Sequence, residues 1–315
     1  MNTRKTEKTT NSRLFNKGIL PVAVATAMFG AGVASAADFY LTNDATIDNQ
    51  TGGNATTNYI VNQNATLSTN GSMSVYYGTI DGQGGVASGR GGTVTIGGNL
   101  TMHGNIGATN ATGNFTISEW NSLTLASNVS TFNSDNMTLS DNTVLNFGNV
   151  TSGYNRGSSE TLTFASNITM GSNSTINVGN GTTLNGNIYG AGTLNVLGNF
   201  TSTGSIGAAQ VDGADFITSG LEQINISKGN TFTLNNNATA TRMNINGTVT
   251  VAGNITAAVT MGADGILNLN NESGDDNAAK VVGAIQSYVA GTAQGTLNIN
   301  GTFTTQGAIG QGGKG

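Results

Sequence analysis

The stretch GTVTIGGNLTMHGNIGA, residues 92–108, decides the fold because the chain repeats it twice. It returns as GTLNVLGNFTSTGSIGA at residues 192–208 and as GTLNINGTFTTQGAIGQ at residues 295–311. The copies are offset by 100 and then 103 residues. Their glycines and their apolar residues stay in phase, which identifies a repeat array with superrepeats that start near residues 92, 192 and 295.

The positions that align predict what kind of array this is. Apolar residues alternate with polar ones, the period of a β-strand with one buried face. A glycine follows each short segment, where the backbone can turn or approach a neighbour closely. Strand and glycine turn in alternation predict an all-β fold, a parallel β-helix or β-solenoid. The aligned apolar positions are Val94, Leu194 and Leu297; Ile96, Val196 and Ile299; Leu100, Phe200 and Phe303; and Ile106, Ile206 and Ile309.

Short strand patterns also fill the sequence between the copies. TVTI, LTM, FTI, LTL, MTL, VLNF, LTF, ITM, INV and LNV follow one another from Thr93 onward. Their connections are too short for crossover helices, so parallel strands must stack coil on coil. With roughly 20–25 residues per coil and ~4.8 Å between strands, we expect about 12 coils. Residues 92–315 form the solenoid, which we expect to be truncated at its C-terminal end.

Three segments fit this rhythm less well and are expected to be loops or lateral excursions. They are residues 152–161, 209–222 and 271–294. Within the last of them, Lys280 to Ser287 is expected to form a short helical turn. Residues 37–91 carry looser strand patterns and a cluster of tyrosines, so we interpret them as an N-terminal capping region.

The first 36 residues read as a secretory signal peptide. A basic segment with Arg4, Lys5, Lys8, Arg13 and Lys17 precedes an apolar run over residues 19–33. The small residues Ala34-Ser35-Ala36 then predict cleavage after Ala36. A retained membrane anchor is the alternative, although the apolar run is short for a membrane span.

The charged residues and the absence of cysteine limit which partners and which kinds of stabilisation we expect. After residue 36 the chain has six basic and fifteen acidic residues, a net charge of −9. That charge argues against nucleic acid and against anionic lipid. An exported chain without cysteine has no disulfide framework. Stability must come from stacked backbone ladders and a thin apolar core.

No catalytic, cofactor-binding or metal site is predicted. His103 is the only histidine and stands where Thr203 and Gln306 stand in the other copies, so we expect an outward-facing polar position. A Ser–His–Asp triad elsewhere would need a second histidine. We expect the lone tryptophan, Trp120, to cover the core.

Acidic residues and glycosylation sequons carry the remaining hypotheses. The densest acidic cluster is Glu272 with Asp275 and Asp276, near Lys280, and we interpret it as a solvated loop. N-x-S/T sequons recur at Asn99, Asn114, Asn136, Asn167, Asn199, Asn254 and Asn300. An Asn/Thr-rich strand composition produces such sequons by chance, and any glycan on them would point outward.

The GTLNV…GxIG units and the Asn/Thr/Gly-rich strands resemble the passenger regions of autotransporter-type Gram-negative surface proteins, in particular rickettsial-type outer-membrane adhesin repeats. The resemblance covers about residues 92–315. It implies a right-handed parallel β-helix at the cell surface or outside the cell. Adhesion to a host-cell surface or matrix receptor, or a surface coat, would be its function. Membrane association would run through a C-terminal barrel that this chain lacks.

Two other functions stay open on the sequence. A secreted polysaccharide-acting β-helix enzyme would need Asp275, Asp276 and Lys280 gathered on one face. A self-assembling extracellular fibre is favoured by low charge and by Asn ladders along the stack.

Overall fold

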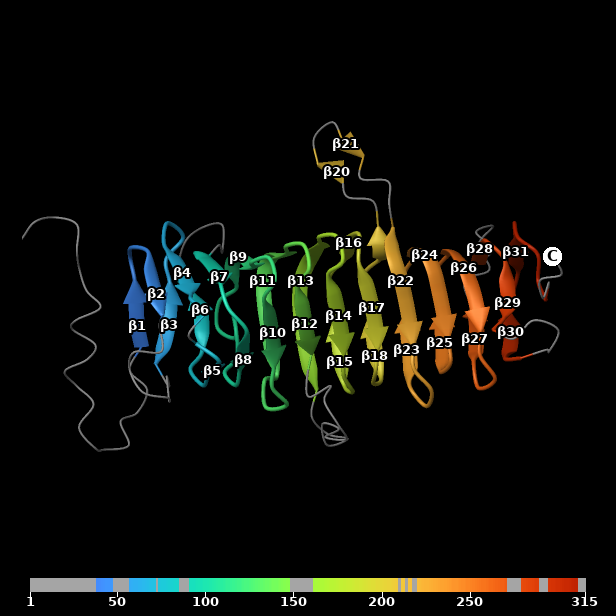
Figure 1. Cartoon of the computed structure of the whole chain (residues 1–315), viewed down its shortest axis with the longest axis horizontal. Coiled ribbons are helices and arrows are strands. Elements are labelled where there is room, and N and C mark those ends of the chain that lie inside the picture. Colours follow the sequence, from blue (N-terminus) through green and yellow to red (C-terminus); the bar gives the residue numbers. More distant parts are fainter. Residues whose placement is uncertain are drawn as a thin grey trace, which may run out of the picture. The chain divides into compact units, whose positions relative to one another are not determined.

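A computed structural model describes residues 38–47, 57–71, 73–84, 91–147, 161–208, 211–212, 215–216, 220–270, 279–288 and 294–310. These residues belong to one compact unit that begins at Ala36. They form strands and turns and no helix, and their long sheets are parallel. Figure 1 shows the labelled strands following one another in chain order. The all-β class is thereby confirmed, and the parallel sheets are consistent with a β-helix or solenoid. The predicted signal peptide lies outside the described residues.

Strand pairing sorts the chain into three columns, which the chain visits in a fixed order. Column 1 holds β1 (Asp38–Leu41), β3 (Asn58–Val61), β6 (Ile80–Gly82), the beginnings of β11 (Thr131–Leu139) and β13 (Leu162–Met170), β15 (Thr182–Leu184), β18 (Phe200–Ser202), β23 (Thr231–Leu234), β25 (Thr248–Val251), β27 (Ile266–Asn270) and β30 (Thr296–Asn300). Isolated bridges of Ile106 to Ile80 and Phe132 continue this column between β6 and β11.

The other two columns are built in the same way. Column 2 holds β2 (Ala45–Ile47), β4 (Thr66–Thr69), β7 (Thr93–Ile96), β9 (Thr112–Ile117), the ends of β11 and β13, β16 (Ile188–Gly190), β19 (Ile206–Ala208), the beginnings of β24 (Ala238–Ile245) and β26 (Ile255–Met261), β28 (Ala279–Val282) and β31 (Phe303–Thr305). Column 3 holds β5 (Val75–Tyr76), β8 (Leu100–Met102), β10 (Ser122–Leu125), β12 (Val144–Phe147), β14 (Thr175–Val178), β17 (Thr193–Val196), β22 (Leu221–Ile226), the ends of β24 and β26, and β29 (Ile285–Ser287).

We call one pass through the three columns a level, and one column at one level a side. The inward ladder of column 1 has twelve members: Phe39, Tyr59, Ile80, Ile106, Phe132, Phe164, Leu184, Ser202, Leu234, Val251, Leu269 and Ile299. The number of levels agrees with the expected number of coils. The spacing between levels is less even than expected. The longest steps run from Phe132 to Phe164, from Ser202 to Leu234 and from Leu269 to Ile299, and each contains one of the three segments expected to be loops or excursions.

A continuous apolar core runs along the stack because inward positions keep their apolar side chains at nearly every level. In column 3, one unbroken ladder consists of Leu100, Leu123, Leu145, Ile176, Leu194, Ile224, Met243, Val259 and Ile285. All of these side chains are buried. Each strand contributes only a few inward residues, so its burial depends on the levels before and after it.

The three repeat copies occupy three different columns. The first strand of the copy is β7 in column 2, β17 in column 3 and β30 in column 1. From β7 to β17, and again from β17 to β30, the chain passes four complete levels and one further side. The superrepeat is therefore thirteen sides long. The same strand-and-turn motif serves on every column.

The last glycine of the repeat motif helps to explain why the same motif can occupy any of the three columns. Gly107, Gly207 and Gly310 adopt positive φ angles of 62°, 67° and 76° in the three copies. A Cβ atom at Gly107 would lie 2.0 Å from the carbonyl oxygen of Asn133, and one at Gly207 would lie 1.9 Å from that of Thr239. Only glycine accepts both the angle and the close backbone contact, so it marks the same corner on each column.

Two of the segments expected to depart from the strand rhythm contain strands. The expected helical turn at Lys280–Ser287 is wrong, because β28 and β29 occupy it and place Val281 and Ile285 in the inward ladders. Gly283, with φ of 130°, separates the two strands. The expected excursion at 209–222 contains β20 (Val211–Asp212) and β21 (Asp215–Phe216), which form an antiparallel pair, before β22 rejoins column 3.

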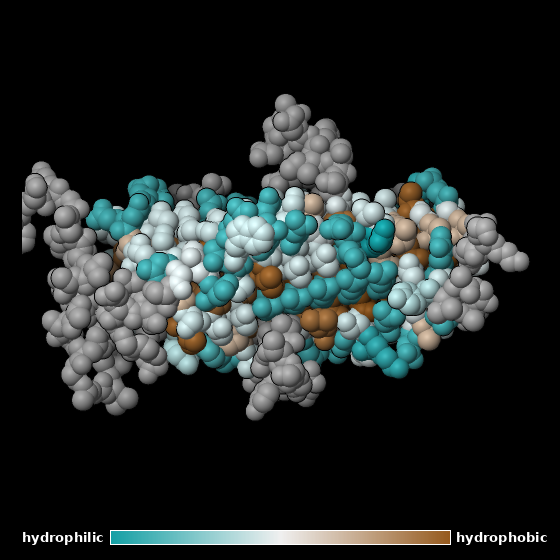
Figure 2. Space-filling model, in the orientation of Figure 1, coloured by the Kyte–Doolittle hydropathy of each residue, from teal (hydrophilic) through white to brown (hydrophobic). Residues whose placement is uncertain are grey.

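Asparagine side chains form a ladder along the outward side of column 3. The Nδ2 atom of each donates to the Oδ1 atom of the one before it at 2.8 Å, through Asn146, Asn177, Asn195, Asn225 and Asn244. Asn146 itself donates to Thr124 at 3.0 Å. Figure 2 shows hydrophilic side chains gathered in a band along the visible face. An in-register parallel stack brings identical amides to hydrogen-bonding distance, as in other cross-β ladders.

Stacked strands also account for several sequons. Asn114, Asn136 and Asn167 lie on successive levels of column 2, and Thr116, Thr138 and Thr169 form a parallel ladder two residues further on. Outward positions in a strand are two residues apart. Each of these strands therefore carries an Asn of one ladder and, two residues later, a Thr of the other, which gives the sequence N-x-T.

Candidate functional site

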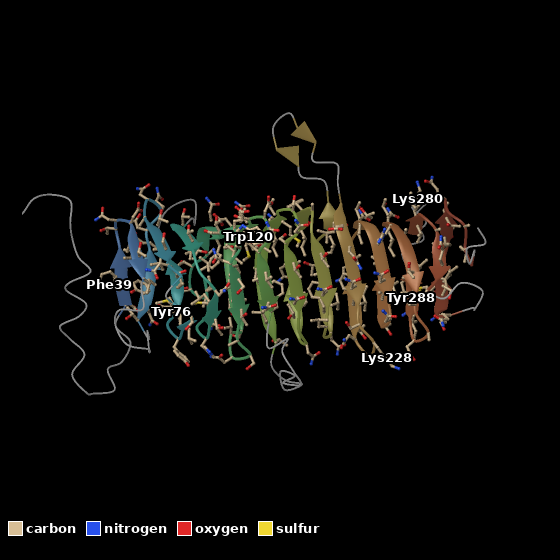
Figure 3. All side chains as sticks on the ribbon, in the orientation of Figure 1. Phe39, Tyr76, Trp120, Lys228, Lys280 and Tyr288 are labelled. Atoms are coloured by element: carbon tan, nitrogen blue, oxygen red, sulfur yellow. The ribbon has the colours of Figure 1, made fainter. Side chains whose placement is uncertain are left out.

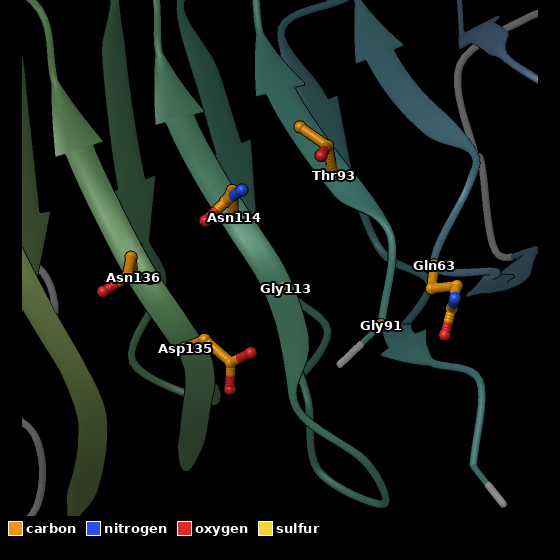
Figure 4. A pocket seen from close by; sticks show the side chains of 7 residues that line it. All are labelled: Gln63, Gly91, Thr93, Gly113, Asn114, Asp135 and Asn136. Carbon is orange, nitrogen blue, oxygen red and sulfur yellow. The ribbon is translucent and has the colours of Figure 1, made fainter. Parts of the chain in front are cut away.

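A recess lies where the chain enters column 2. It has a volume of about 230 Å³ and spans four levels (Figure 4). Its lining is Gln63, Gly91, Thr93, Gly113, Asn114, Asp135 and Asn136. The recess is thus polar, and it sits beside the Asn ladder of column 2.

A β-bulge in β11 shapes this recess. Asn133 pairs with Ala165 and Asn136 with Asn167, so two residues of β11 face one residue of β13. The alternation breaks there, and neither Asp135 nor Asn136 points into the core. Bulges re-aim side chains in this manner and are common next to functional sites. Figure 4 shows the Asp135 carboxylate pointing toward the strand that carries Gly113.

Gly113 lies opposite Asp135, on the level between Asp135 and Gly91. An added Cβ atom at Gly113 would lie 2.4 Å from the carbonyl oxygen of Gly91, so the close approach of the two strands requires a glycine.

The lining can bind a small polar ligand. Three carboxamides offer donors and acceptors, Thr93 adds a hydroxyl, and Asp135 is the one carboxylate. Paired carboxyl groups, the usual machinery for glycosidic cleavage, do not occur in this lining. The arrangement therefore offers several hydrogen-bonding groups to a hydroxyl-bearing ligand.

His103 lies in a different place, at the end of β8 in column 3. Its ring stacks on that of Tyr77, with centroids 4.5 Å apart and an interplanar angle of 17°. Its Nδ1 atom is 3.2 Å from Oδ1 of Asn128, whose Nδ2 atom donates to the His103 carbonyl at 2.6 Å. The expected polar position is thus one member of an aromatic and amide cluster at the surface.

Trp120 does not cover the core, contrary to the sequence-based expectation. Its side chain is 72% exposed, in the turn between β9 and β10 (Figure 3). Its φ angle is 65°, and Asn142 and Asn173, at the equivalent turns of the next two levels, have φ angles of 57° and 56°. The turn geometry sets this position outward, and asparagine accepts it more easily than tryptophan does.

The acidic cluster Glu272, Asp275 and Asp276 lies outside the described residues. Lys280 is half-buried in β28, and its backbone N–H donates to Oδ1 of Asn254 at 2.9 Å. No three His, Cys, Asp or Glu residues in the described ranges come close enough together to hold a metal ion. Nor does the described part of the chain contain a helix long and apolar enough to cross a membrane.

Sequence reasoning missed the recess at Asp135. One signal was present: Asn133 to Asn136 are four successive polar residues at the start of NSDNMTL, where a half-buried strand should alternate. Such a break predicts a bulge but not the glycine opposite it.

No protein-family model, curated protein or solved structure matches this chain.

Proposed function

We propose that this protein is an exported, non-enzymatic scaffold that acts in adhesion or as a surface coat, as the passenger of an autotransporter-type surface protein does. The observation that carries the proposal is the stack of three parallel columns with polar ladders along its outward sides. Such a stack presents a long, repetitive surface without needing a preformed active site.

The finer architecture belongs to the same proposal. The three columns close around the apolar core as a parallel β-helix, and residues 1–36 are a signal peptide removed after Ala36. The near-complete burial of inward side chains from all three columns supports the closure. The basic segment, apolar run and Ala34-Ser35-Ala36 support export.

The recess around Asp135 is the proposed contact with a hydroxyl-bearing ligand on the target surface, such as a glycan. Its three carboxamides, hydroxyl and carboxylate support hydrogen bonding to several hydroxyl groups at once. The net charge of −9 after residue 36 favours targets other than nucleic acid or anionic lipid.

Attachment of cells that display the protein tests this function. Deleting the gene should reduce attachment, and restoring the gene should return it. Asp135→Asn should weaken attachment because it alters the carboxylate of the recess. Asp264→Asn is the matched control, since Asp264 is an exposed residue that pairs with Lys228 at 2.9 Å and lines no part of the recess. Unchanged attachment together with an unchanged surface after gene deletion would contradict the proposal.

A further inference from the structure

The two ends of the described stack expose apolar side chains that belong to the inward ladders. Phe39 and Ile299 are the first and last members of the inward ladder of column 1, and they are 44% and 49% exposed. The members from Ile80 to Leu269 are buried. Figure 3 shows Phe39 at the β1 end. Among the described residues, neither end carries a further polar level that covers these side chains, as the capping repeats of solenoids do.

The repeat shows what normally covers such a level. Val196 and Ile206 in the second copy are 0% exposed, whereas Ile299 and Ile309 at the same positions of the third copy are 49% and 50% exposed. The second copy is covered by β22, β23 and β24 of the next level. The third copy has the same inward residues but no such level among the described residues.

The strand edges at both ends are also open to pairing. Within the described chain, β30 and β31 pair only with the preceding level, and β1 and β2 only with the following one. Residues 295–310 contain no charged side chain and no proline, the usual protections of an edge strand.

The acidic residues at the β1 end do not protect the open edges of β1 and β2 from pairing either. Oδ1 of Asp38 accepts a hydrogen bond from Asn58 at 3.2 Å, and Oδ1 of Asp44 accepts one from the backbone N–H of Thr66 at 2.8 Å. Both carboxylates therefore bind the second level of their own stack.

We propose that a second copy of this chain adds to the first end to end. β1 and β2 of one copy pair in parallel with β30 and β31 of the other, and Phe39 stacks on Ile299. The contact repeats the pairing already present at every internal level of columns 1 and 2. It is heterologous, so each addition leaves a free end and the copies form a filament.

The proposal depends on the parallel stack and not on surface display. Its test therefore uses no cells and no ligand, and a failure of adhesion would leave it untouched. The chain from Ala37 is the right material, because Ala36–Gly315 form one compact unit that contains every described pairing.

Sedimentation velocity and electron microscopy over a concentration series test the assembly. The wild-type chain should form end-to-end filaments. Ile299→Lys should raise the concentration needed at least about tenfold, because assembly would bury an unpaired charge. Thr256→Lys adds the same charge at an exposed, outward position of β26, which already pairs on both sides inside the stack, and should assemble as wild type does. Melting curves establish that each variant is folded.

A complementation experiment distinguishes head-to-tail stacking from other association. Phe39→Lys blocks one end and Ile299→Lys the other, so at concentrations where the wild-type chain just assembles each variant alone should remain monomeric. Mixed in equal amounts, they should form dimers and nothing larger. A monomeric wild type at every concentration, dimers of either variant alone, or a mixture that stays monomeric would each overturn the proposal.

Discussion

At the scale of single residues, two positions hold a residue type that is unusual for its backbone angle or for its burial. Trp120 occupies a left-handed turn position that asparagine holds on the next two levels. Tyr76 is a buried phenol at the third column, and its hydroxyl donates to the carbonyl oxygen of Thr57. Each residue leads to a measurable consequence.

Replacing Trp120 with asparagine should stabilise the protein. The exposed indole contributes little burial, and a bulky residue with positive φ costs about 1–3 kcal/mol. We expect Trp120→Asn to raise the melting temperature and the reverse change, Asn142→Trp, to lower it. A lower melting temperature for Trp120→Asn would show that the indole makes a stabilising contact instead.

Tyr76 should make stability depend on alkaline pH. Burial, and secondarily the charge of Tyr59, raise the pKa of the Tyr76 phenol above its ordinary value of 10.0. The folded chain then keeps the proton at a pH where the unfolded chain releases it. This contribution to stability is complete below about pH 10 and is lost as the pH rises further.

Melting temperatures measured from pH 8 to pH 11 test this dependence. The wild-type melting temperature should fall more steeply above pH 10 than that of Tyr76→Phe, which has no ionisable phenol. Tyr40→Phe alters an exposed tyrosine and serves as the matched control. Parallel curves for wild type and Tyr76→Phe would refute the assignment.

At the scale of elements, each strand depends on its neighbours in the same column. Outward Asn side chains connect the strands of column 3 through one amide hydrogen bond per level. A member in the middle of the ladder makes two of these bonds, whereas the last member, Asn244, makes one. Position in the ladder should therefore decide the cost of a substitution.

Truncating the middle of the ladder should cost more than truncating its end. Asn195→Ala removes the bonds to Asn177 and Asn225, and Asn244→Ala removes only the bond to Asn225. At about 0.5–1.5 kcal/mol net per hydrogen bond, Asn195→Ala should cost about 1–3 kcal/mol and Asn244→Ala about half as much. Urea denaturation measures both, and equal costs would mean that the ladder bonds do not add.

Sequence patterns predicted the strands well, but they failed at three places where the chain departs from simple alternation. TVTI, VLNF and LNV all lie in strands, because alternation and a following glycine specify a short half-buried strand. The segment at Lys280–Ser287 was misread because Gly283 joins two strands and interrupts their alternation. Trp120 was misread because burial was inferred from its side chain, while the turn fixes its direction. The recess at Asp135 needs a bulge and an opposite glycine on separate strands, a pairing that no local pattern contains.

At the scale of the whole chain, the interchangeable motif predicts tolerance to large deletions. The copies of the repeat begin on three different columns, so no side demands its own sequence. Removing residues 92–187 deletes four complete levels and leaves β16 in column 2. Removing residues 92–191 deletes thirteen sides and moves β17 from column 3 into column 2.

Both deletions should give folded chains with strand-rich circular dichroism and cooperative melting. Melting temperatures should fall in both, because fewer levels cover one another. The longer deletion also shifts the strands that follow it by one column, and this shift should lower the melting temperature little further. If only the deletion of residues 92–187 folds, the three columns are not equivalent.

The thirteen-side period has a consequence for how the far end of the stack is oriented. Recombination between two copies would add or remove four levels and one side. In a closed β-helix the distal portion would then be displaced along the axis and also rotated by about a third of a turn. A patch that faced away from a target could in this way be brought round to meet it, with no change to any residue within the patch.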